Sequence, residues 1–317
     1  MPTTAPSFAG RIEPPLPPRN HVARPRLREA LDAAVPHSVT LVVAPAGFGK
    51  TVALADFART AEFPVAWLSM VSADADVVTF ADTLVRAVQR AVPGFGERVL
   101  QIVRRAGGRA VEVLAAELAD ELAERGGPIG LVLDDFHAVD PDAKETADAV
   151  RLVDLLLERA PPNLFVLIGS RTLPALRHAD FASAGRLHGV AAEELRFTPA
   201  EVAEWLGVEP SDRRAAEAYD RTQGWAAALL LGGVALPGDA LAGYLKREIW
   251  DGLEPEARRF FLRAAVPATL TADLCRDVLG EPKGPLYLED ARQSSLFVAA
   301  LPSGQWRLHD LFRDFLR

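Results

Sequence analysis

Residues 41–51 have the residue types and the spacing of a phosphate-binding loop. An apolar run ends in a glycine-containing turn, after which Lys50 and Thr51 open a helical pattern over residues 52–59. In such a turn, successive backbone N–H groups and a helix N-terminus with roughly half a positive charge point at the bound anion. The lysine would reach the β- and γ-phosphates, and the threonine hydroxyl would ligate Mg²⁺.

The sequence therefore predicts a nucleotide-binding loop that consists of Pro45, Ala46, Gly47, Phe48, Gly49, Lys50, Thr51 and Val52. Ala44 departs from the strict pattern G-x-x-x-x-G-K-[ST], which has a glycine at that position. The competing interpretation is a turn that merely precedes a helix. The guanine-specifying sequence Asn-Lys-x-Asp is absent, so we favour ATP or ADP over a guanine nucleotide.

Two acids, Asp134 and Asp135, follow the apolar run of residues 129–133. Asp134 would hold Mg²⁺, usually through water, because Mg²⁺ keeps part of its hydration shell. Asp135 would act as a general base toward the attacking water. The alternative is a pair of solvated loop acids. The nearby His137 has a weaker signal, because it would either orient a loop or lie at the surface.

Arg171 follows a further apolar run, residues 164–168. Its guanidinium would emerge near the γ-phosphate, pair with the phosphate oxygens and report whether that phosphate is present. A surface arginine is the alternative, and Ser170 is a lesser candidate. These patterns predict the catalytic residues Lys50, Asp135 and Arg171 and the metal ligands Thr51 and Asp134.

A sheet must position these residues. Strands are predicted over residues 39–43, 65–69, 129–133, 164–168 and, more weakly, 187–195, and they alternate with helices over residues 24–34, 52–59, 77–91, 110–125 and 143–159. Apolar strands that alternate with helices are typical of an α/β parallel sheet with helices on both faces. Such sheets bind ligands at the carboxyl ends of their strands, where the loop, the two acids and Arg171 all fall.

Beyond Arg196 the pattern becomes helical. Thr198 and Glu201 form a capping box that starts a helix over residues 200–206. The remaining predicted elements are helices over residues 213–221 and 226–231, a hinge over 236–238, short helices from 239, and a hairpin of residues 296–301 and 305–308. Helices followed by a terminal hairpin favour a winged-helix unit.

We therefore predict four segments. They are a disordered proline-rich leader (residues 1–19), a P-loop nucleotide-binding domain (20–196), a helical subdomain (197–236) and a winged-helix domain (237–317). The helical pattern over residues 311–317 reaches the end of the sequence without a cap, which suggests a cut from a longer polypeptide.

Composition narrows the class of protein. The net charge of −8 disfavours a DNA-contacting chain, because nucleic-acid-binding proteins carry a basic footprint. The single cysteine, Cys275, excludes an intramolecular disulfide and fits a core residue in a reducing cytosol. The longest apolar run, residues 225–231, is too short to span a bilayer. We expect a cytoplasmic protein without membrane association.

Six short motifs occur in order along the chain: Val22-Ala-Arg-Pro-Arg-Leu27, Ala44-Pro-Ala-Gly-Phe-Gly-Lys-Thr51, Leu133-Asp-Asp-Phe-His137, Ser170-Arg171, Gly224-Trp225 and His309-Asp-Leu-Phe312. Together they resemble the ATPase module of the MalT-like, LuxR-type transcriptional regulators, which belong to the signal-transduction ATPases with numerous domains (STAND). The resemblance covers roughly residues 20–317. Phosphate loops of this family commonly have a small residue where Ala44 stands.

The resemblance implies roles for further residues. Val22 and Arg24 would lie near the adenine and the phosphates, and Arg171 would be the γ-phosphate sensor. His309, which its chemistry alone would make structural or exposed, would match a winged-helix histidine that contacts the β-phosphate of ADP in a closed state. Family members continue into an inducer-binding superhelix and often a DNA-binding helix-turn-helix, neither of which is in this chain. We expect no direct nucleic-acid binding by the chain itself.

The resemblance also implies a switch with slow ATP hydrolysis. ADP would hold a closed monomer, a small-molecule or protein inducer acting through the absent C-terminal region would open it, and ATP-bound modules would self-associate. One alternative is an ATP-driven motor or a small-molecule kinase with fast turnover, for which a second acid–base set is lacking. The other is a nucleotide-indifferent scaffold, against which the intact Lys50, Thr51 and acid pair argue.

Overall fold

The computed structural model describes residues 8–18, 20–35, 37–106, 111–140, 147–232, 239–295, 297–301 and 304–317. The chain forms two compact units. The first comprises Met1–Val43 and Lys50–Leu195, and the second comprises Ala44–Gly49 and Arg196–Arg317. The loop predicted to bind phosphate is therefore divided between the two units. Its turn, Ala44–Gly49, belongs to the second unit, whereas Lys50 begins a helix of the first unit.

The first unit is built on a five-stranded sheet of β1 (Val39–Val43), β2 (Val65–Ser69), β3 (Ile129–Asp134), β4 (Leu164–Ser170) and β5 (Leu187–Ala191). Their order is β2-β3-β4-β1-β5, and the strands pair in parallel. The predicted parallel sheet is thus confirmed. Since β4 lies between β1 and β3, the carboxyl ends of these three strands are neighbours.

β5 is shorter than the strand predicted over residues 187–195. It ends at Ala191, and Ala192–Leu195 forms the short helix α9. The Glu194 carboxylate accepts the N–H of Ala191 at 2.8 Å, a local bond that favours the start of a helix over continued pairing.

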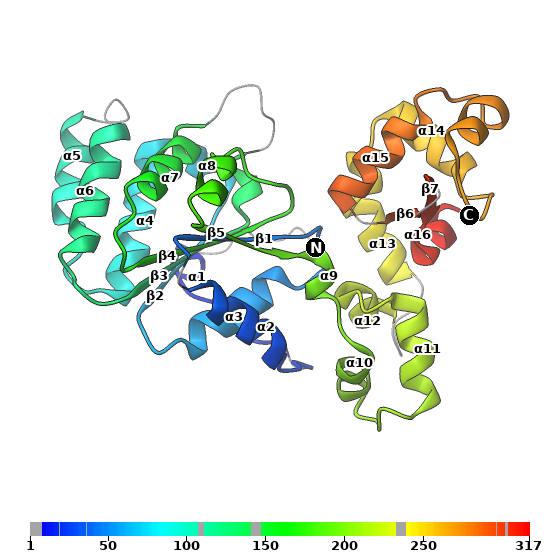
Figure 1. Ribbon diagram of the computed structural model, residues 1–317, viewed down its shortest axis with the longest axis horizontal. Coiled ribbons are helices and arrows are strands. Elements are labelled where there is room, and N and C mark those ends of the chain that lie inside the picture. Colours follow the sequence, from blue (N-terminus) through cyan, green and yellow to red (C-terminus); the bar gives the residue numbers. More distant parts are fainter. Residues whose placement is uncertain are drawn as a thin grey trace. The chain divides into compact units, whose positions relative to one another are not determined.

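Helices cover both faces of this sheet (Figure 1). α2 (Pro25–Ala34) and α3 (Lys50–Thr60) lie on one face, and α4 (Val77–Ala91) and α7 (Asp148–Glu158) lie on the other, with α5 (Glu97–Ala106) and α6 (Val111–Ala123) beyond α4. The Asp76 side chain accepts the N–H of Thr79 at 2.9 Å and caps α4. We did not predict α5 or α8 (His178–Ser183), and residues 143–146, where α7 was expected to begin, lie outside the described residues.

A buried ion pair fixes the amino-terminal segment. The helix α1 (Phe8–Arg11) ends at Arg11, which pairs with Asp74 of the 3₁₀ helix η1 (Ser72–Ala75) and donates to the Ser69 backbone oxygen at 3.1 Å. Asp74 is fully buried. Residues 8–11 therefore differ from the disordered leader that we expected over residues 1–19, because a buried carboxylate requires its cation.

The second unit begins with three helices, α10 (Pro199–Leu206), α11 (Arg213–Thr222) and α12 (Ala226–Gly232). The predicted capping box is confirmed, because the Glu201 N–H donates to Thr198 Oγ1 at 3.2 Å and the Thr198 N–H donates to the Glu201 carboxylate at 2.8 Å. The hinge predicted over residues 236–238 lies outside the described residues.

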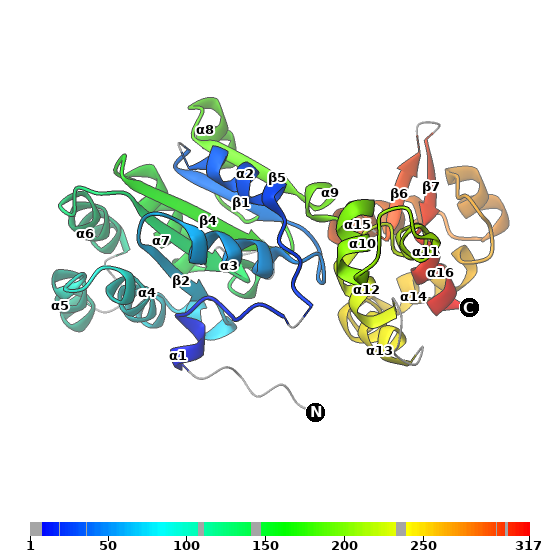
Figure 2. The same cartoon turned by 90° about the horizontal axis from the view of Figure 1, so that it is seen from below.

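A winged helix completes the second unit (Figure 2). After α13 (Asp239–Glu248) and the 3₁₀ helix η4 (Trp250–Gly252), its elements are α14 (Pro255–Ala264), the π-helix η5 (Leu274–Val278), α15 (Gly284–Ser295), the antiparallel strands β6 (Val298–Leu301) and β7 (Gln305–Leu308), and α16 (Asp310–Leu316). The buried rings of Phe260, Phe261 and Phe312 form its core. None of the helices in the described part of the chain is long and apolar enough to cross a bilayer.

Candidate functional site

The carboxyl ends of β1, β3 and β4 gather polar side chains of the first unit. Asp134 is the last residue of β3, Ser170 is the last residue of β4, and Lys50 begins α3 just after the loop that follows β1. Lys50 is 6% exposed, Asp134 is 1% exposed and Ser170 is fully buried. The fold therefore places an ammonium, a carboxylate and a hydroxyl at one buried edge of the sheet.

Asp134 is a buried acid whose hydrogen-bonding capacity is not met. Among the described residues, neither of its carboxylate oxygens accepts a well-formed hydrogen bond, and the Ser170 hydroxyl has no partner. Burial and the Asp135 charge raise the pKa of Asp134 to about 6, against the opposing effects of the neighbouring Thr51 hydroxyl, of the Asp135 backbone N–H and of the Lys50 charge. Buried polar atoms without partners are rare and often mark a ligand site, so this edge is a candidate binding site.

Lys50, Arg171 and the two acids form one charged cluster. Burial lowers the pKa of Lys50 to about 8; the Asp134 charge opposes this shift, the Arg171 charge adds to it and the Asp135 charge again opposes it. Two cations that repel each other at a buried edge favour an anion that can interact with both. The structure thus brings the predicted catalytic residues Lys50, Asp135 and Arg171 together, while their roles stay predictions.

A divalent cation fits this cluster in combination with a phosphate ligand. Within the described residues there is no group of three or more His, Cys, Asp or Glu side chains that could hold a metal ion by itself. The Thr51 hydroxyl and the Asp134 carboxylate are neighbours, however, and Mg²⁺ commonly combines one or two protein oxygens with water and phosphate oxygens. The unsatisfied oxygens of Asp134 fit such an ion.

The backbone around the acids is specialised. A Cβ at Gly169 in β4 would lie 2.6 Å from Asp134 Oδ1 and 2.8 Å from Leu54 Cδ1, so the absence of a side chain there makes room for the Asp134 carboxylate. Asp135 has φ 55° and ψ 36°, a left-handed conformation that costs about 1 kcal/mol or more in residues other than glycine. Strained backbone of this kind clusters at functional sites.

The turn of the predicted loop is enclosed by helices α12 and α13. Gly47 and Gly49 have φ of 78° and 83°, which accounts for glycine at both positions. The Gly47 oxygen accepts the N–H of Ala227 at 2.9 Å. A Cβ at Gly47 would lie 2.7 Å from the Tyr244 hydroxyl and 3.0 Å from the Trp225 indole nitrogen. The loop backbone is therefore held by residues about 180 positions further along the chain.

The other predicted loop residues are apolar and buried or half-buried: Pro45, Ala46, Phe48 and Val52. The Phe48 ring contacts Trp225, with ring centroids 6.4 Å apart, and Trp225 contacts Phe297 with centroids 4.9 Å apart. Aromatic contacts thus connect the loop to the segment that precedes β6. Trp225 is 1% exposed.

Val22 and Arg24, expected near the adenine and the phosphates, are buried in the first unit. Arg24 donates to the Leu195 backbone oxygen at 2.9 Å, which connects the residue before α2 to the end of α9. This contact accounts for part of the burial of Arg24. The role of both residues in binding a nucleotide stays a prediction.

His309 precedes α16 and caps it. Its Nδ1 accepts the N–H of Leu311 at 3.3 Å. Burial and the Arg196 charge lower the pKa of His309 to about 4, so its imidazole is neutral near pH 7. Because Nδ1 accepts a hydrogen bond, the proton of the neutral ring is on Nε2. Nε2 is buried and makes no well-formed hydrogen bond to the described residues, although the Thr222 backbone lies close enough to oppose the lowering of the pKa of the ring.

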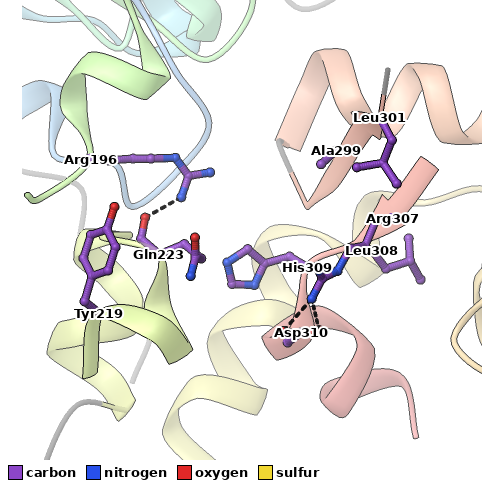
Figure 3. Close-up of a pocket in the computed structure, with 9 residues that line it drawn as sticks. All are labelled: Arg196, Tyr219, Gln223, Ala299, Leu301, Arg307, Leu308, His309 and Asp310. Carbon is purple, nitrogen blue, oxygen red and sulfur yellow. Dashed lines mark hydrogen bonds and ion pairs between the residues drawn. The ribbon is translucent and has the colours of Figure 1, made fainter. Parts of the chain in front are cut away.

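Sequence reasoning missed Arg196 and Gln223, which line the same pocket as His309 (Figure 3). The Arg196 guanidinium carbon lies 5.3 Å from the centre of the Phe48 ring, and Arg196 donates to the Gln223 backbone oxygen at 2.7 Å. No local pattern identifies Arg196, because its partners lie far from it in the sequence. The single available signal is its place just before the capping box of α10.

Two parts of the chain match known domain families. Residues 35–176 match the AAA domain, and residues 246–317 match the MalT winged helix domain. The HTH-type transcriptional regulator MalT of Yersinia enterocolitica serotype O:8 / biotype 1B is 30% identical over 322 residues, which cover 94% of this chain and 35% of that protein. The chain thus spans about a third of the length of the curated relatives that it matches.

Solved structures include similar chains. A Walker-type ATPase of Pyrococcus abyssi is 16% identical, and the match covers 98% of this chain and 99% of that chain with a TM-score of 0.65, which shows a shared fold. A STAND protein with a tetratricopeptide repeat sensor from Pyrococcus horikoshii is 19% identical, and that match covers 96% of this chain and 44% of the other with a TM-score of 0.49.

Proposed function

We propose that this chain, in which a match to the AAA domain precedes a match to the MalT winged helix domain, is a MalT-like signal-transduction switch that binds ATP and ADP. The observation that carries this proposal is the buried Asp134, whose oxygens lack well-formed hydrogen bonds among the described residues, in one charged cluster with Lys50. A protein that used this fold only as a scaffold would gain stability by replacing such an acid.

In this proposal each charged residue of the cluster has a separate task. Lys50 binds the β- and γ-phosphates, and Arg171 pairs with the γ-phosphate. Thr51 and Asp134 hold Mg²⁺, which when bound neutralises charge on the phosphate oxygens. Asp135 takes the proton of the attacking water as general base.

The proposed switch depends on which nucleotide is bound. ADP favours a closed monomer, ATP favours self-association, and slow hydrolysis returns the module to the ADP state. A shift of such an equilibrium from 1:99 to 99:1 needs about 10⁴-fold differential affinity, or about 5.5 kcal/mol. Hydrogen bonds to charged groups contribute about 1.5–3 kcal/mol each. A few differential contacts, such as Arg171 with the γ-phosphate and His309 with the β-phosphate of ADP, are of the required size.

The test is to identify the nucleotide that co-purifies with the chain and to measure its turnover. We expect tightly held ADP and hydrolysis far slower than the roughly 1–1,000 s⁻¹ of typical enzymes. Lys50→Ala should abolish ADP binding. Lys246→Ala is the matched control, because Lys246 is exposed and pairs with Asp251 at 2.9 Å. Fast turnover, or ADP binding that survives Lys50→Ala, would contradict the proposal.

Self-association is tested separately. Light scattering should give a monomer with ADP and larger species with a non-hydrolysable ATP analogue. The description of the relatives as transcriptional regulators supports the further proposal that the module acts in a regulator of transcription, and that an inducer controls it through segments beyond this chain.

A further inference from the structure

A series of hydrogen bonds connects Arg11 to the peptide group that joins Asp134 and Asp135. The Nε–H of Arg11 donates to the Ser69 backbone oxygen at 3.1 Å. The N–H of Met70 donates to the Asp134 backbone oxygen at 2.8 Å. The Ser69 oxygen and the Met70 N–H belong to one peptide group. Arg11 is therefore separated from the backbone of the predicted metal ligand by that single peptide group.

The carboxyl end of β3 receives its backbone support from β2. The register between β3 and β4 ends at Leu133, whereas the register between β2 and β3 continues to Asp134, which lies opposite Ser69. The Met70 N–H then binds the Asp134 oxygen at the point where the pairing with β4 has ended. The position of this peptide group therefore depends on where the end of β2 lies.

The peptide group between Asp134 and Asp135 orients both acids. Asp135 has the left-handed φ of 55°, a conformation that persists where the surrounding contacts determine it. The N–H of Asp135 lies close enough to the Asp134 carboxylate to oppose the rise in pKa that burial causes. The oxygen of the same peptide group is the one that accepts the Met70 N–H. A shift of Met70 would therefore be transmitted to both carboxylates.

The Arg11 guanidinium is itself fixed. Its side chain is 11% exposed and pairs with the fully buried Asp74, whose carboxylate also accepts the N–H of Val71 at 2.8 Å. A guanidinium is a rigid, planar set of donors, so the bond to Asp74 also determines where Nε–H points. Because Asp74 compensates the charge of Arg11, we assign to Arg11 an effect on geometry and not a long-range electrostatic effect.

We propose that Arg11 is a positioning residue of the nucleotide site. Through the Ser69–Met70 peptide group it sets where Asp134 and Asp135 place their carboxylates toward Mg²⁺ and the phosphates. This inference rests on the proposed function, because the two acids act on that ligand. It gives α1, in the segment that we expected to be disordered, a part in the arrangement of the site.

The first test measures how much Mg²⁺ strengthens ADP binding, as the ratio of the Kd without Mg²⁺ to the Kd with Mg²⁺. Arg11→Lys keeps a cation beside Asp74 but has one donor nitrogen in place of the guanidinium fork, so it loses the Nε–H donor to Ser69. We expect the ratio to fall about 3- to 10-fold, less than the roughly 10- to 100-fold cost of removing a group bonded directly to a metal ligand. The Kd for ADP without Mg²⁺ should stay unchanged. Arg11→Met, which has no donor, should lower the ratio at least as much.

Glu13→Gln is the matched control. Glu13 pairs with Arg90 of α4 and so attaches the same amino-terminal segment to the first unit, but at an exposed position. Its substitution should leave the Mg²⁺ ratio at the wild-type value. Thermal unfolding of each variant identifies loss of the fold, and if Arg11→Met does not fold, Arg11→Lys decides.

A second readout needs no nucleotide. The Met70 N–H is protected from exchange with deuterated solvent by its bond to Asp134. In Arg11→Lys this amide should exchange about 3- to 10-fold faster, the range expected for the weakening of one hydrogen bond. The amides of Leu131 and Val132, in the middle of β3, should keep their wild-type rates.

Two results would overturn the assignment. One is an unchanged Mg²⁺ ratio in both Arg11 variants while the wild-type chain binds ADP more tightly with Mg²⁺. The other is an equal acceleration of exchange at Met70, Leu131 and Val132, which is the signature of general destabilisation. A wild-type chain that binds no ADP, or binds it equally with and without Mg²⁺, would refute the proposed function instead. In that case the exchange rates still decide whether Arg11 holds the Met70 contact, so the two failures are distinguishable.

Discussion

Substitution of Gly169 by alanine tests whether the space taken by the Asp134 carboxylate sets the geometry of the site. The new Cβ would lie 2.6 Å from Asp134 Oδ1 and 2.8 Å from Leu54 Cδ1, both well inside van der Waals contact. β4 pairs with strands on both sides, so its backbone has little freedom to move away. Overpacking a buried site costs about 1–3 kcal/mol. We expect Gly169→Ala to lower the free energy of unfolding by about 2 kcal/mol, in the middle of that range, and to weaken nucleotide binding by displacing Asp134.

Two other glycines of the same sheet are matched controls. A Cβ at Gly130 in β3 would lie 3.0 Å from Val65 Cγ2, a tight contact with a side chain, and a Cβ at Gly189 in β5 would meet nothing within 4 Å. Gly189→Ala should therefore be neutral or stabilise the chain by about 0.4–1 kcal/mol. Gly130→Ala should fall between the other two and leave nucleotide binding intact.

A double-mutant cycle isolates the contact between Gly169 and Asp134. In an Asp134→Ala background the carboxylate is gone, so Gly169→Ala should cost about 1 kcal/mol less than in the wild type; contacting residues typically couple by about 0.5–3 kcal/mol. Part of the cost remains because of Leu54. Urea unfolding of the nucleotide-free chain measures all four corners of the cycle. An equal cost in both backgrounds, or a cost no larger than at Gly189, would refute the reasoning.

Three further predictions follow from the charged and capping groups. Burial lowers the pKa of Lys50 to about 8, and phosphate binding favours its protonated form. The affinity for ADP, measured without Mg²⁺, should therefore fall as the pH rises through 8, by up to about tenfold per pH unit. A constant affinity from pH 7 to 9 would exclude the lowered pKa of Lys50. Since His309 Nδ1 caps α16, His309→Ala should lower the free energy of unfolding by about 1 kcal/mol, whereas His309→Asn should preserve the cap. Both variants should weaken ADP binding. Equal thermal unfolding midpoints for the two variants would argue against the cap. Arg11→Ala leaves the carboxylate of Asp74 buried without its cation, so it should lower the free energy of unfolding in urea by about 3 kcal/mol. A loss below about 0.5 kcal/mol would show that the amino-terminal segment is dispensable for stability.

The sheet and the acidic end of β3 could be predicted because their signals are local. β1, β3 and β4 are mostly apolar and buried, and helices separate the strands, which together indicate a parallel sheet. Asp134 and Arg171 follow such strands directly, so the rule that sites lie at the carboxyl ends of parallel strands was enough to place them. α5 was also within reach, because Val99, Ile102 and Val103 have helical spacing and pack on the core.

Other features depend on partners that are distant in the sequence. Arg11 lies in the segment that we predicted to be a disordered proline-rich leader, and its partner Asp74 is 63 residues later in the chain. Arg196 contacts the Phe48 ring and donates to the Gln223 backbone oxygen, and nothing in its immediate sequence neighbourhood indicates either contact. Sequence patterns report local periodicity, whereas these contacts are determined by how separate elements pack.

The enclosure of Gly47 by Ala227, Trp225 and Tyr244 has a consequence for how the chain matures on the ribosome. Synthesis proceeds from the amino terminus at about 5–20 residues per second, so Lys50 and the β1 strand emerge roughly ten or more seconds before Tyr244. During that interval the nascent chain has a phosphate loop without its flanking walls. The loop reaches its final surroundings only when α13 has left the exit tunnel, and a chain that is released early, after Leu195, retains the charged cluster but never completes the loop.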